Sequence, residues 1–342
     1  MHIGNLSSAA KPAQSTLWIA LWLVGTLAPC EAAGKYARFD PPGSTLTNPE
    51  SINGAGSIAG LYMDQDYYTH GFVRSSDGTI VSFDPPGSTD TEVRSIDTRG
   101  AVAGYYTDAN SVTHGFERQA SGTIQTFDVS GAVTLEVTNI NSKGVITGDY
   151  EDGNDIYHGF IRAADGTVAT YDVPGEPRGT FPAGINSANL SVGYYQDGSG
   201  AFHGYLRAAD GTYTIFDPSG SGDTFPTSIN ESGAVTGYYT DSSGTNYYGF
   251  VRTADGTITS FAPPYGGEIL PNSINRSGAV TGIFPAEDGT FEGFVRNADG
   301  SIKSFQVSGI GYPTYANSID AKGKITGSYN DENGSHGYLR NR

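Results

Sequence analysis

The feature that most constrains this chain is a unit of 44 or 45 residues that occurs seven times along it. An isoleucine followed by Asn or Asp marks each copy, at Ile52, Ile96, Ile140, Ile185, Ile229, Ile274 and Ile319. A unit this short cannot bury its own apolar face, so neighbouring units must stack and share a core. The repeat therefore overrides the expectation of two domains that the length of 342 residues alone would suggest.

Each copy contains four segments with the composition of β-strands, separated by turn signals. In the second copy the first segment ends at Ile96, the next two span 102–106 and 113–118, and the fourth ends at Phe127. Asp-Gly pairs lie between the third and fourth segments of most copies, and such pairs favour hairpins. The fourth segment ends at an aromatic residue in every copy: Phe39, Phe83, Phe127, Tyr171, Phe216, Phe261 and Phe305. We therefore expect four short antiparallel strands in each unit.

The turn after the first segment ends in a residue that tolerates positive φ. The residues at this position are Gly56, Gly100, Gly144, Asn189, Gly233, Gly278 and Gly323. Asn is the non-glycine residue best suited to that conformation. The Asn or Asp that begins the turn can accept hydrogen bonds from its own backbone, which predicts a structural role for it.

The beginning and the end of the chain add up to one further unit. Residues 35–40 resemble a fourth strand without the three before it, and residues 337–340 resemble a third strand without a fourth. An open stack of repeats needs distinct capping units, and the sequence shows none, whereas a ring needs no caps. The predicted fold class is all-β: a seven-bladed β-propeller with four antiparallel strands per blade, the last blade closed by the N-terminal strand.

The N-terminal segment differs in kind from the repeats. Lys11 precedes an apolar run over 17–27, and two alanines follow at the end of the segment. The run is too short to span a bilayer but suits a secretory signal. We expect residues 1–33 to be a signal peptide and residues 34–342 to form a single propeller domain. A retained N-terminus, or lipid attachment at Cys30, is the alternative.

Charge and cysteine content narrow the compartment and the partners. The net charge of −17 and the pI near 4.5 argue against nucleic acid and anionic lipid as partners. After removal of the signal the chain would contain no cysteine, so it would be stable without disulfides. We expect a monomer without a membrane span, secreted or located in the periplasm or outside the cell.

The repeat resembles the extracellular HAF repeat family, whose units carry an Ile-Asn turn, a Gly-containing strand and a His-Ala-Phe motif. The corresponding segments here are 140–148, with the sequence Ile-Asn-Ser-Lys-Gly-Val-Ile-Thr-Gly, and 158–162, with His-Gly-Phe-Ile-Arg. The likeness covers residues 36–340 and departs from the family by placing Gly in the middle of His-Ala-Phe. It implies secretion and a repeated β architecture, and it leaves the ligand open.

Two residue types recur at one position of the unit and invite functional hypotheses. Histidines stand at His70, His114, His158, His203 and His336, and arginines at Arg74, Arg118, Arg162, Arg207, Arg252, Arg296 and Arg340. Equivalent histidines on different blades are too far apart to share one zinc ion, so we expect packing or a hydrogen bond within a blade. For the arginines we expect ion pairs, within or between blades, with the aspartates one strand away: Asp40, Asp84, Asp128, Asp172 and Asp217. A ligand-facing ring of arginines is the alternative.

Paired tyrosines and acidic hairpins suggest ligands but have simpler interpretations. Pairs such as Tyr105 and Tyr106 could stack on sugar rings, yet both faces of a blade are covered by its neighbours, which predicts core packing. The acidic hairpins around residues 64–66 and 151–155 could hold calcium, but neither has the spacing of a known calcium loop. We therefore expect no cofactor.

Motifs for nucleophilic, metal-dependent or phosphate chemistry are missing from the sequence. A ligand site should break the repeat, because one ligand cannot meet seven identical surroundings. The residues that deviate most lie in or near the loops entering the first strands, and these are the predicted ligand-binding residues: Glu92, Arg94, Glu136, Glu176, Arg178, Tyr265, Glu268 and Tyr312.

These observations favour a secreted, non-enzymatic repeat protein that serves as a binding or interaction scaffold. Its ligand would be a glycan or a protein at one face of the propeller. The alternative is a polysaccharide hydrolase or lyase on the same scaffold, which would need two carboxylates about 5 to 9 Å apart. A purely structural surface protein is the third hypothesis.

Overall fold

The computed structural model describes residues 36–175, 178–264, 266–308 and 311–342. These residues form 28 β-strands and no helix. None of them therefore lies in a helix long and apolar enough to cross a membrane. The predicted signal peptide, and the candidate residues Glu176 and Tyr265, lie outside the described residues.

The strands form antiparallel groups of four, here called units and named after their first strand. The β2 unit contains β2 (Leu46–Ile52), β3 (Ile58–Met63), β4 (Thr69–Arg74) and β5 (Ile80–Phe83). The β6 unit contains β6 (Ser88–Ile96), β7 (Val102–Asp108), β8 (Thr113–Arg118) and β9 (Ile124–Phe127). The β10 unit contains β10 (Thr134–Ile140), β11 (Ile146–Glu151), β12 (Tyr157–Arg162) and β13 (Val168–Tyr171). The β14 unit contains β14 (Gly179–Ile185), β15 (Ser191–Gln196), β16 (Phe202–Arg207) and β17 (Tyr213–Phe216).

The remaining strands continue the pattern. The β18 unit contains β18 (Ser221–Ile229), β19 (Val235–Asp241), β20 (Tyr247–Arg252) and β21 (Ile258–Phe261). The β22 unit contains β22 (Leu270–Ile274), β23 (Val280–Pro285), β24 (Phe291–Arg296) and β25 (Ile302–Phe305). The β26 unit contains β26 (Thr314–Ile319), β27 (Ile325–Asp331) and β28 (Gly334–Arg340), and its fourth strand is β1 (Tyr36–Phe39), which pairs antiparallel with β28.

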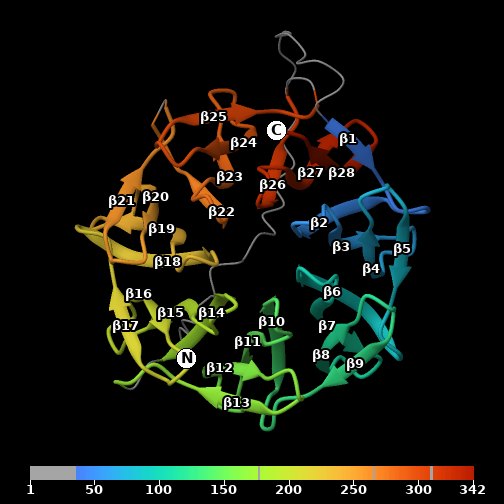
Figure 1. The fold of residues 1–342 in the computed structure, drawn as a ribbon, viewed down its shortest axis with the longest axis horizontal. Helices are drawn as coiled ribbons and strands as arrows, with labels where there is room; N and C mark the ends of the chain where they lie inside the picture. Colours follow the sequence, from blue (N-terminus) through green and yellow to red (C-terminus); the bar gives the residue numbers. More distant parts are fainter. Residues whose placement is uncertain (1–35, 176–177, 265, 309–310) are drawn as a thin grey trace, which may run out of the picture.

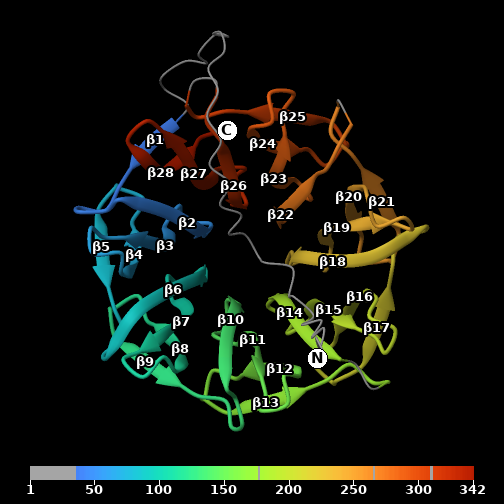
Figure 2. The ribbon, with the colours of Figure 1, turned by 180° about the vertical axis from the view of Figure 1, so that it is seen from behind.

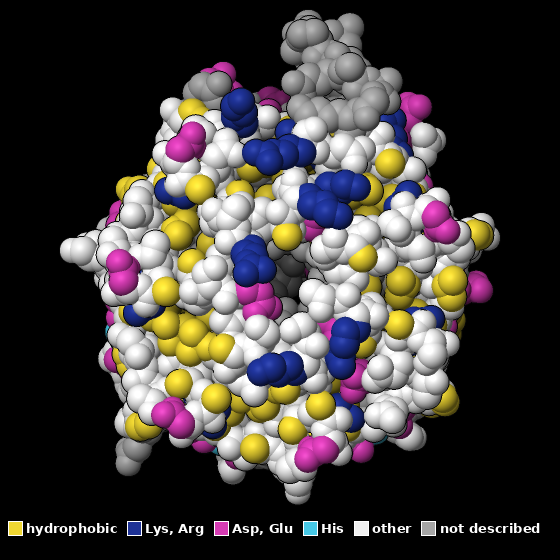
Figure 3. Space-filling model, in the orientation of Figure 1, with side chains coloured by type: hydrophobic (Ala, Val, Ile, Leu, Met, Phe, Trp, Pro, Cys, Tyr) yellow, Lys and Arg dark blue, Asp and Glu magenta, His cyan; other side chains and the backbone are white. Residues whose placement is uncertain are grey.

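The units stand around a central axis, with the first strand of each unit innermost and the fourth outermost (Figures 1 and 2). The space-filling view is hollowed at the centre of the disc, where acidic and basic side chains lie together (Figure 3). A radial arrangement of four-stranded antiparallel sheets is the architecture of a β-propeller. Single parallel bridges between Leu46 and Ser335, and between Tyr157 and Gly179, link neighbouring units.

Local sequence signals set the strand boundaries. Every fourth strand ends at the aromatic residue predicted for it. The turn residues after the first strands all have positive φ, between 58° at Asn189 and 86° at Gly56 and Gly100. In the first of these turns the Oδ1 atom of Asn53 accepts hydrogen bonds from the backbone of Ala55 and Ser57, each at 3.0 Å. The structural role predicted for these Asn and Asp residues is therefore confirmed.

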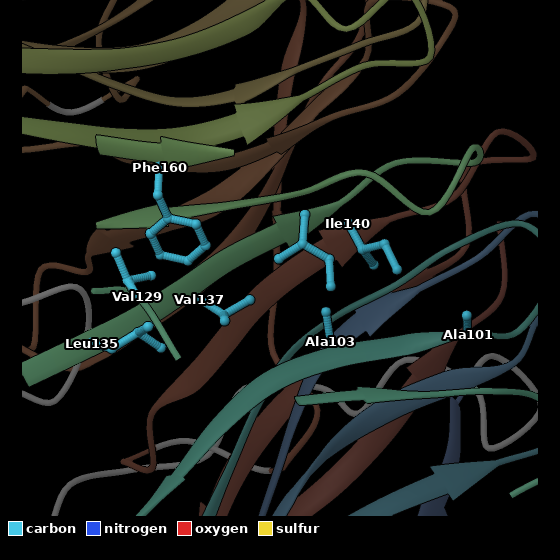
Figure 4. Packing of buried hydrophobic residues seen from close by; sticks show 8 residues of the cluster. Ala101, Ala103, Val129, Leu135, Val137, Ile140 and Phe160 are labelled. Atoms are coloured by element: carbon cyan, nitrogen blue, oxygen red, sulfur yellow. The ribbon is translucent and has the colours of Figure 1, made fainter. Parts of the chain in front are cut away.

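The core is divided among the contacts between units. In the contact between the β6 and β10 units, Ala101 and Ala103 face Val137 and Ile140, and the cluster continues through Val129, Leu135 and Phe160 (Figure 4). Ala103, Val137 and Phe160 are fully buried. Because each cluster draws residues from two units, no unit buries its apolar face alone.

The glycine in the middle of His-Gly-Phe is required by the fourth strand of its own unit. A Cβ atom at Gly71 would lie 2.6 Å from the Cζ atom of Phe83, whose ring covers this position. The same contact recurs at Gly159, where a Cβ atom would lie 2.7 Å from Tyr171. The departure from the His-Ala-Phe motif thus follows from the ring that packs across the third strand.

Among the described residues, none of these arginines forms an ion pair with Asp40, Asp84, Asp128, Asp172 or Asp217, so this part of the sequence interpretation is wrong. Each guanidinium lies over the fourth-strand aromatic ring of the preceding unit, 4.6 to 5.0 Å from the ring centroid. The pairs are Arg74 with Phe39, Arg118 with Phe83, Arg162 with Phe127, Arg207 with Tyr171, Arg252 with Phe216, Arg296 with Phe261 and Arg340 with Phe305. Arg162 also forms an ion pair with Glu117 at 3.0 Å, but this acid belongs to the third strand of the neighbouring unit.

We predict that Gly71→Ala destabilises the protein by about 1 to 3 kcal/mol, the usual cost of overpacking. The added methyl group would displace the ring of Phe83 and, with it, the stacked Arg118. Gly54→Ala in the same unit is the matched control, because nothing lies within 4 Å of its Cβ position. Urea unfolding of both variants tests this, and equal midpoints for Gly71→Ala and the unmodified protein would contradict it.

Candidate functional site

The innermost strands carry the side chains that differ most between units. Each of these strands has a buried residue at which its pairing register shifts: Pro49, Val93, Val137, Pro182, Pro226, Pro271 and Ala316. The two residues on either side of it, here called flanking residues, thus belong to the strands nearest the central axis (Figure 1). They change from charged to aromatic around the ring, so this is where the repeat is broken.

Three consecutive innermost strands bring charged flanking residues together. These residues are Glu50 on β2, Glu92 and Arg94 on β6, and Glu136 on β10. The Nη2 atom of Arg94 donates to the hydroxyl of Tyr105 at 3.0 Å and lies 4.0 Å from a carboxylate oxygen of Glu92. The guanidinium of Arg94 also lies over the ring of Tyr105, 5.4 Å from its centroid. We call these five residues the charged cluster.

Burial and mutual repulsion shift the protonation of the acids in this cluster. Burial raises the pKa of Glu50 to about 7; Arg94 and a hydrogen bond from Asn48 lower it, and Glu92 raises it. Burial likewise raises the pKa of Glu92, with Arg94 opposing and Asp90 and Glu136 adding to the rise. The cluster therefore combines one fixed cation with one carboxyl group, that of Glu50, which can be protonated near neutral pH.

The flanking residues before the register shift on β14 and β18 are aromatic. Phe181 stacks on Tyr194 at a centroid distance of 5.0 Å, and Tyr194 meets Phe225 edge-on at 5.3 Å. Phe225 continues to Tyr238 at 5.1 Å. Burial raises the pKa of Tyr194, and Asp149 and Glu136 contribute to the rise, so the acidic and aromatic sectors adjoin at β10.

Polar flanking residues elsewhere in the ring join consecutive innermost strands. Thr227 donates to the carbonyl of Pro271 at 2.9 Å, Asn272 to that of Ala316 at 3.0 Å, and Asn317 to that of Pro49 at 2.8 Å. The equivalent positions on β2 and β6 hold Glu50 and Arg94. Their contacts are with Asn48, Glu92 and Tyr105 instead. At these two positions a charged side chain therefore takes the place of one that bonds to the next innermost strand.

The structure brings together only some of the predicted ligand-binding residues. Glu92, Arg94 and Glu136 lie in the charged cluster, whereas Arg178 and Glu268 are exposed in the loops before β14 and β22. Tyr312 is half-buried in the loop before β26. Among the described residues, none of these three interacts with Glu50, Glu92 or Arg94.

Sequence reasoning missed Glu50 and assigned Tyr105 to the core. Glu50 occupies the same position of the unit as Arg94, so alignment of the repeats around the isoleucines marks it as a deviation. Nothing in the sequence distinguishes Tyr105 as a site residue, because it belongs to the Gly-Tyr-Tyr motif of the repeat. Its neighbour Tyr106 is 7% exposed, and Tyr194 and Tyr239 are similarly buried, so the core packing predicted for the paired tyrosines is confirmed for these residues.

The recurrent histidines lie away from the axis, each between two aspartates of its own unit. His70 contacts Asp84 at 2.8 Å and Asp64 at 3.3 Å, and its ring packs on Tyr62. The nearer partners of the others are Asp128 for His114, Asp172 for His158, Asp217 for His203 and Asp40 for His336. The hydrogen bond predicted for these histidines is confirmed. In the described ranges, no group of three or more His, Cys, Asp or Glu side chains is arranged to hold a metal ion.

Comparisons with known proteins establish the fold. No protein-family profile matches the sequence, and no curated protein matches it. The chain is similar to virginiamycin B lyase from Staphylococcus aureus, with 16% identity, a TM-score of 0.58, and coverage of 90% of this chain and 99% of that protein. It is also similar to the β-propeller domain of the Trilobed protease from Pyrococcus furiosus, with 9% identity, a TM-score of 0.63, and coverage of 86% and 95%.

A third similar structure is TolB from Acinetobacter baumannii, with 13% identity, a TM-score of 0.51, and coverage of 73% of this chain and 63% of that one. Identities this low carry the fold and no activity. The prediction of an all-β propeller is confirmed.

The Asp–His–Asp clusters predict how stability depends on pH. Partial burial alone lowers the pKa of His203, but hydrogen bonds with Asp217 and Asp197 outweigh it, so the pKa is raised above 6.5. The stabilisation is therefore complete below the unfolded pKa and is lost as the pH rises through the folded pKa. We predict that His203→Gln makes the decline in unfolding free energy shallower as the pH rises above 6.5.

Tyr248 occupies the histidine position in the β18 unit, so Tyr248→Phe is the control for the pH series and should keep the slope of the unmodified protein. Chemical denaturation at a series of pH values measures both slopes. Parallel curves for His203→Gln and the unmodified protein would show that the cluster does not couple protonation to folding.

The charged cluster predicts opposite shifts in the titration of Glu50. Because Arg94 lowers the pKa of this residue and Glu92 raises it, Arg94→Met should move it above about 7 and Glu92→Gln below that value. Side-chain carboxyl NMR shifts followed against pH report the titration directly. Glu287→Gln, an exposed residue of the β23–β24 hairpin, should leave it unchanged. Shifts of the same sign in both cluster variants would refute the proposed electrostatics.

Proposed function

We propose that this protein is an exported binding scaffold, a seven-bladed β-propeller that holds a glycan or a protein ligand at the charged cluster of its central channel. The proposal combines the confirmed propeller fold with the break in the repeat at the flanking residues. Export and location outside the cytoplasm remain predictions from residues 1–33. Membership of the HAF repeat family, a monomeric state and the absence of a cofactor are also predictions.

The blade count and the closure of the ring are supported by the pairing of β1. Tyr36 stands opposite Arg340 and Phe39 opposite Gly337, so β1 takes the position of a fourth strand beside β26, β27 and β28. Phe39 also contributes the ring on which Arg74 of the β2 unit lies. With β1 counted as the fourth strand of the β26 unit, the 28 strands make seven complete blades.

One observation supports the proposed site most strongly: the charged flanking residues are concentrated on three consecutive innermost strands, β2, β6 and β10. The equivalents of Glu92 on other innermost strands are Asn48, Glu136, Phe181, Phe225, Leu270 and Tyr315. Carboxylates, a guanidinium and the phenol of Tyr105 thus converge on one side, and aromatic rings adjoin them. Carboxyl groups and guanidinium groups bond well to hydroxyl and amide groups, which glycans and peptides both present.

A polysaccharide hydrolase or lyase is the second candidate, and the chemistry of Glu50 favours it specifically. A carboxyl group with a pKa near 7 can serve as a general acid or base at neutral pH. Glu92 is close enough to raise that pKa, so a second carboxyl group lies near that of Glu50. Glycoside cleavage uses such a pair.

We predict that the protein binds a component of a glycan array or captures a partner from the native cell envelope. Arg94→Met and Glu92→Gln should weaken that binding by at least about tenfold, because each removes a charged group from the cluster. The control variant is Glu287→Gln, which should bind normally. Blank results in both assays at high protein concentration would contradict the proposal.

The enzyme candidate is distinguished by turnover. Release of sugar from polysaccharides, lost in both Glu50→Gln and Glu92→Gln, would favour it over simple binding. Binding without turnover across the same polysaccharides would leave the scaffold as the function.

A further inference from the structure

A cavity of about 320 Å³ lies at the junction of the β2 and β6 units, and it is lined by Tyr68, His70, Asp84, Ser88 and Thr89. Tyr68 belongs to the hairpin between β3 and β4, and Ser88 begins β6. Ser88 precedes Glu92 by four residues on an extended strand, which separates the cavity from the charged cluster by about 13 Å. We call this cavity the Tyr68 pocket.

The hairpin above the pocket exposes two adjacent aromatic rings. Tyr67 is 80% exposed and Tyr68 is 51% exposed, whereas Tyr106, Tyr194 and Tyr239 are all below 10%. The residues that take the position of Tyr68 in the next five units are Val112, Ile156, Ala201, Asn246 and Thr290. The aromatic side of the pocket is therefore particular to one unit.

Tyr67 is held in an unfavourable conformation at the tip of the same hairpin. Its φ of 68° lies in the left-handed region, which bulky side chains rarely adopt. The equivalent residues in the next five units are Ser111, Asp155, Gly200, Gly244 and Gly289. A large ring at this position costs conformational energy without being buried, so its presence beside the pocket is not explained by folding.

The polar side of the pocket is fixed in place by hydrogen bonds. Asp84 bonds to His70 through one carboxylate oxygen at 2.8 Å and accepts from the hydroxyl of Thr91 through the other at 2.7 Å. The Asp84 side chain nevertheless remains 40% exposed. Asp84 thus keeps free lone pairs for a ligand, while His70 and Thr91 hold the carboxylate in position.

The two hydroxyl groups of the pocket also offer acceptor oxygens. Ser88 donates to the carbonyl of Pro85 at 2.8 Å, and Thr89 donates to that of Thr107 at 3.1 Å. With their protons engaged, both oxygens are left to accept. A ligand that fits must bring hydrogen-bond donors and an apolar face for the ring of Tyr68.

We infer that the Tyr68 pocket binds a neutral pyranose, whose C–H face stacks on Tyr68 and whose hydroxyl groups donate to Asp84, Ser88 and Thr89. The cavity volume is at the lower end of the range for small-molecule sites, which suits one or two sugar rings. A quaternary ammonium ligand also favours aromatic rings and carboxylates, but it brings no hydroxyl donors for the oxygens of Ser88 and Thr89. This site does not depend on the proposed function of the charged cluster.

The test is titration calorimetry of the full protein with neutral methyl pyranosides, namely the glucoside, mannoside, galactoside and fucoside, and with tetramethylammonium as the competing chemistry. At least one pyranoside should bind saturably. Tyr68→Val, which installs the residue of the next unit, and Asp84→Asn should each weaken binding by at least about tenfold. Val112→Ala in the neighbouring hairpin is the matched control and should bind as the unmodified protein does.

Arg94→Met separates the two sites, since it alters the charged cluster and should leave pyranoside binding unchanged. Three results would overturn the inference: no saturable binding of any of the pyranosides, binding of tetramethylammonium alone, or pyranoside binding that survives Tyr68→Val. Circular dichroism of each variant checks folding, and the exposed position of Tyr68 makes loss of the fold an unexpected outcome.

Discussion

The rest of the structure depends on one repeated contact. An aromatic ring at the end of each fourth strand packs against its own unit and against the next unit. Phe83 covers Gly71 in its own unit and receives the guanidinium of Arg118 from the next. It also meets Phe116 of the next unit edge-on at 5.9 Å. A cation–π contact contributes about 0.5 to 2 kcal/mol, depending on how far it is desolvated. The contact is repeated between consecutive units, so these terms add to the burial of the apolar clusters that the units share.

This contact explains why the repeated motif is so strict and why it says little about function. In His-Gly-Phe-x-Arg the histidine bonds to aspartates of its own unit, and the glycine admits the ring of its own fourth strand. The phenylalanine and the arginine pack on the preceding unit. Each named residue of the motif makes a contact that the fold needs. Ligand recognition can therefore vary only at positions outside these contacts. Such places are the inner edges of the first strands, where Glu50 and Arg94 stand, and the hairpin tips, where Tyr67 and Tyr68 stand.

How well each feature could be predicted from the sequence depends on how far apart in the sequence the interacting residues lie. The ends of the fourth strands and the left-handed turn residues depend on neighbours within a few positions, and they were predicted correctly down to Asn189. The second segment of the β6 unit was predicted to end at residue 106, whereas β7 continues to Asp108. The pairing of arginines with aspartates depends on hairpin register. Gly115 stands opposite Phe127, so the next residue, Asp128, falls opposite His114, while Arg118 lies at the other end of the strand. The charged cluster needs three strands from three units, so sequence could nominate Glu92, Arg94 and Glu136 but could not tell them from Arg178 or Glu268.

The central claim is that the aromatic contacts run unbroken around the ring, with β1 supplying the last of them through Phe39 and Arg74. Removal of residues 36–40 tests it most directly, with thermal unfolding and hydrogen exchange measured on the shortened and complete chains. The account predicts a clearly lower melting temperature and faster exchange in β28 and β4, the strands that β1 pairs with and packs against. An unchanged melting temperature with unchanged protection of both strands would contradict it.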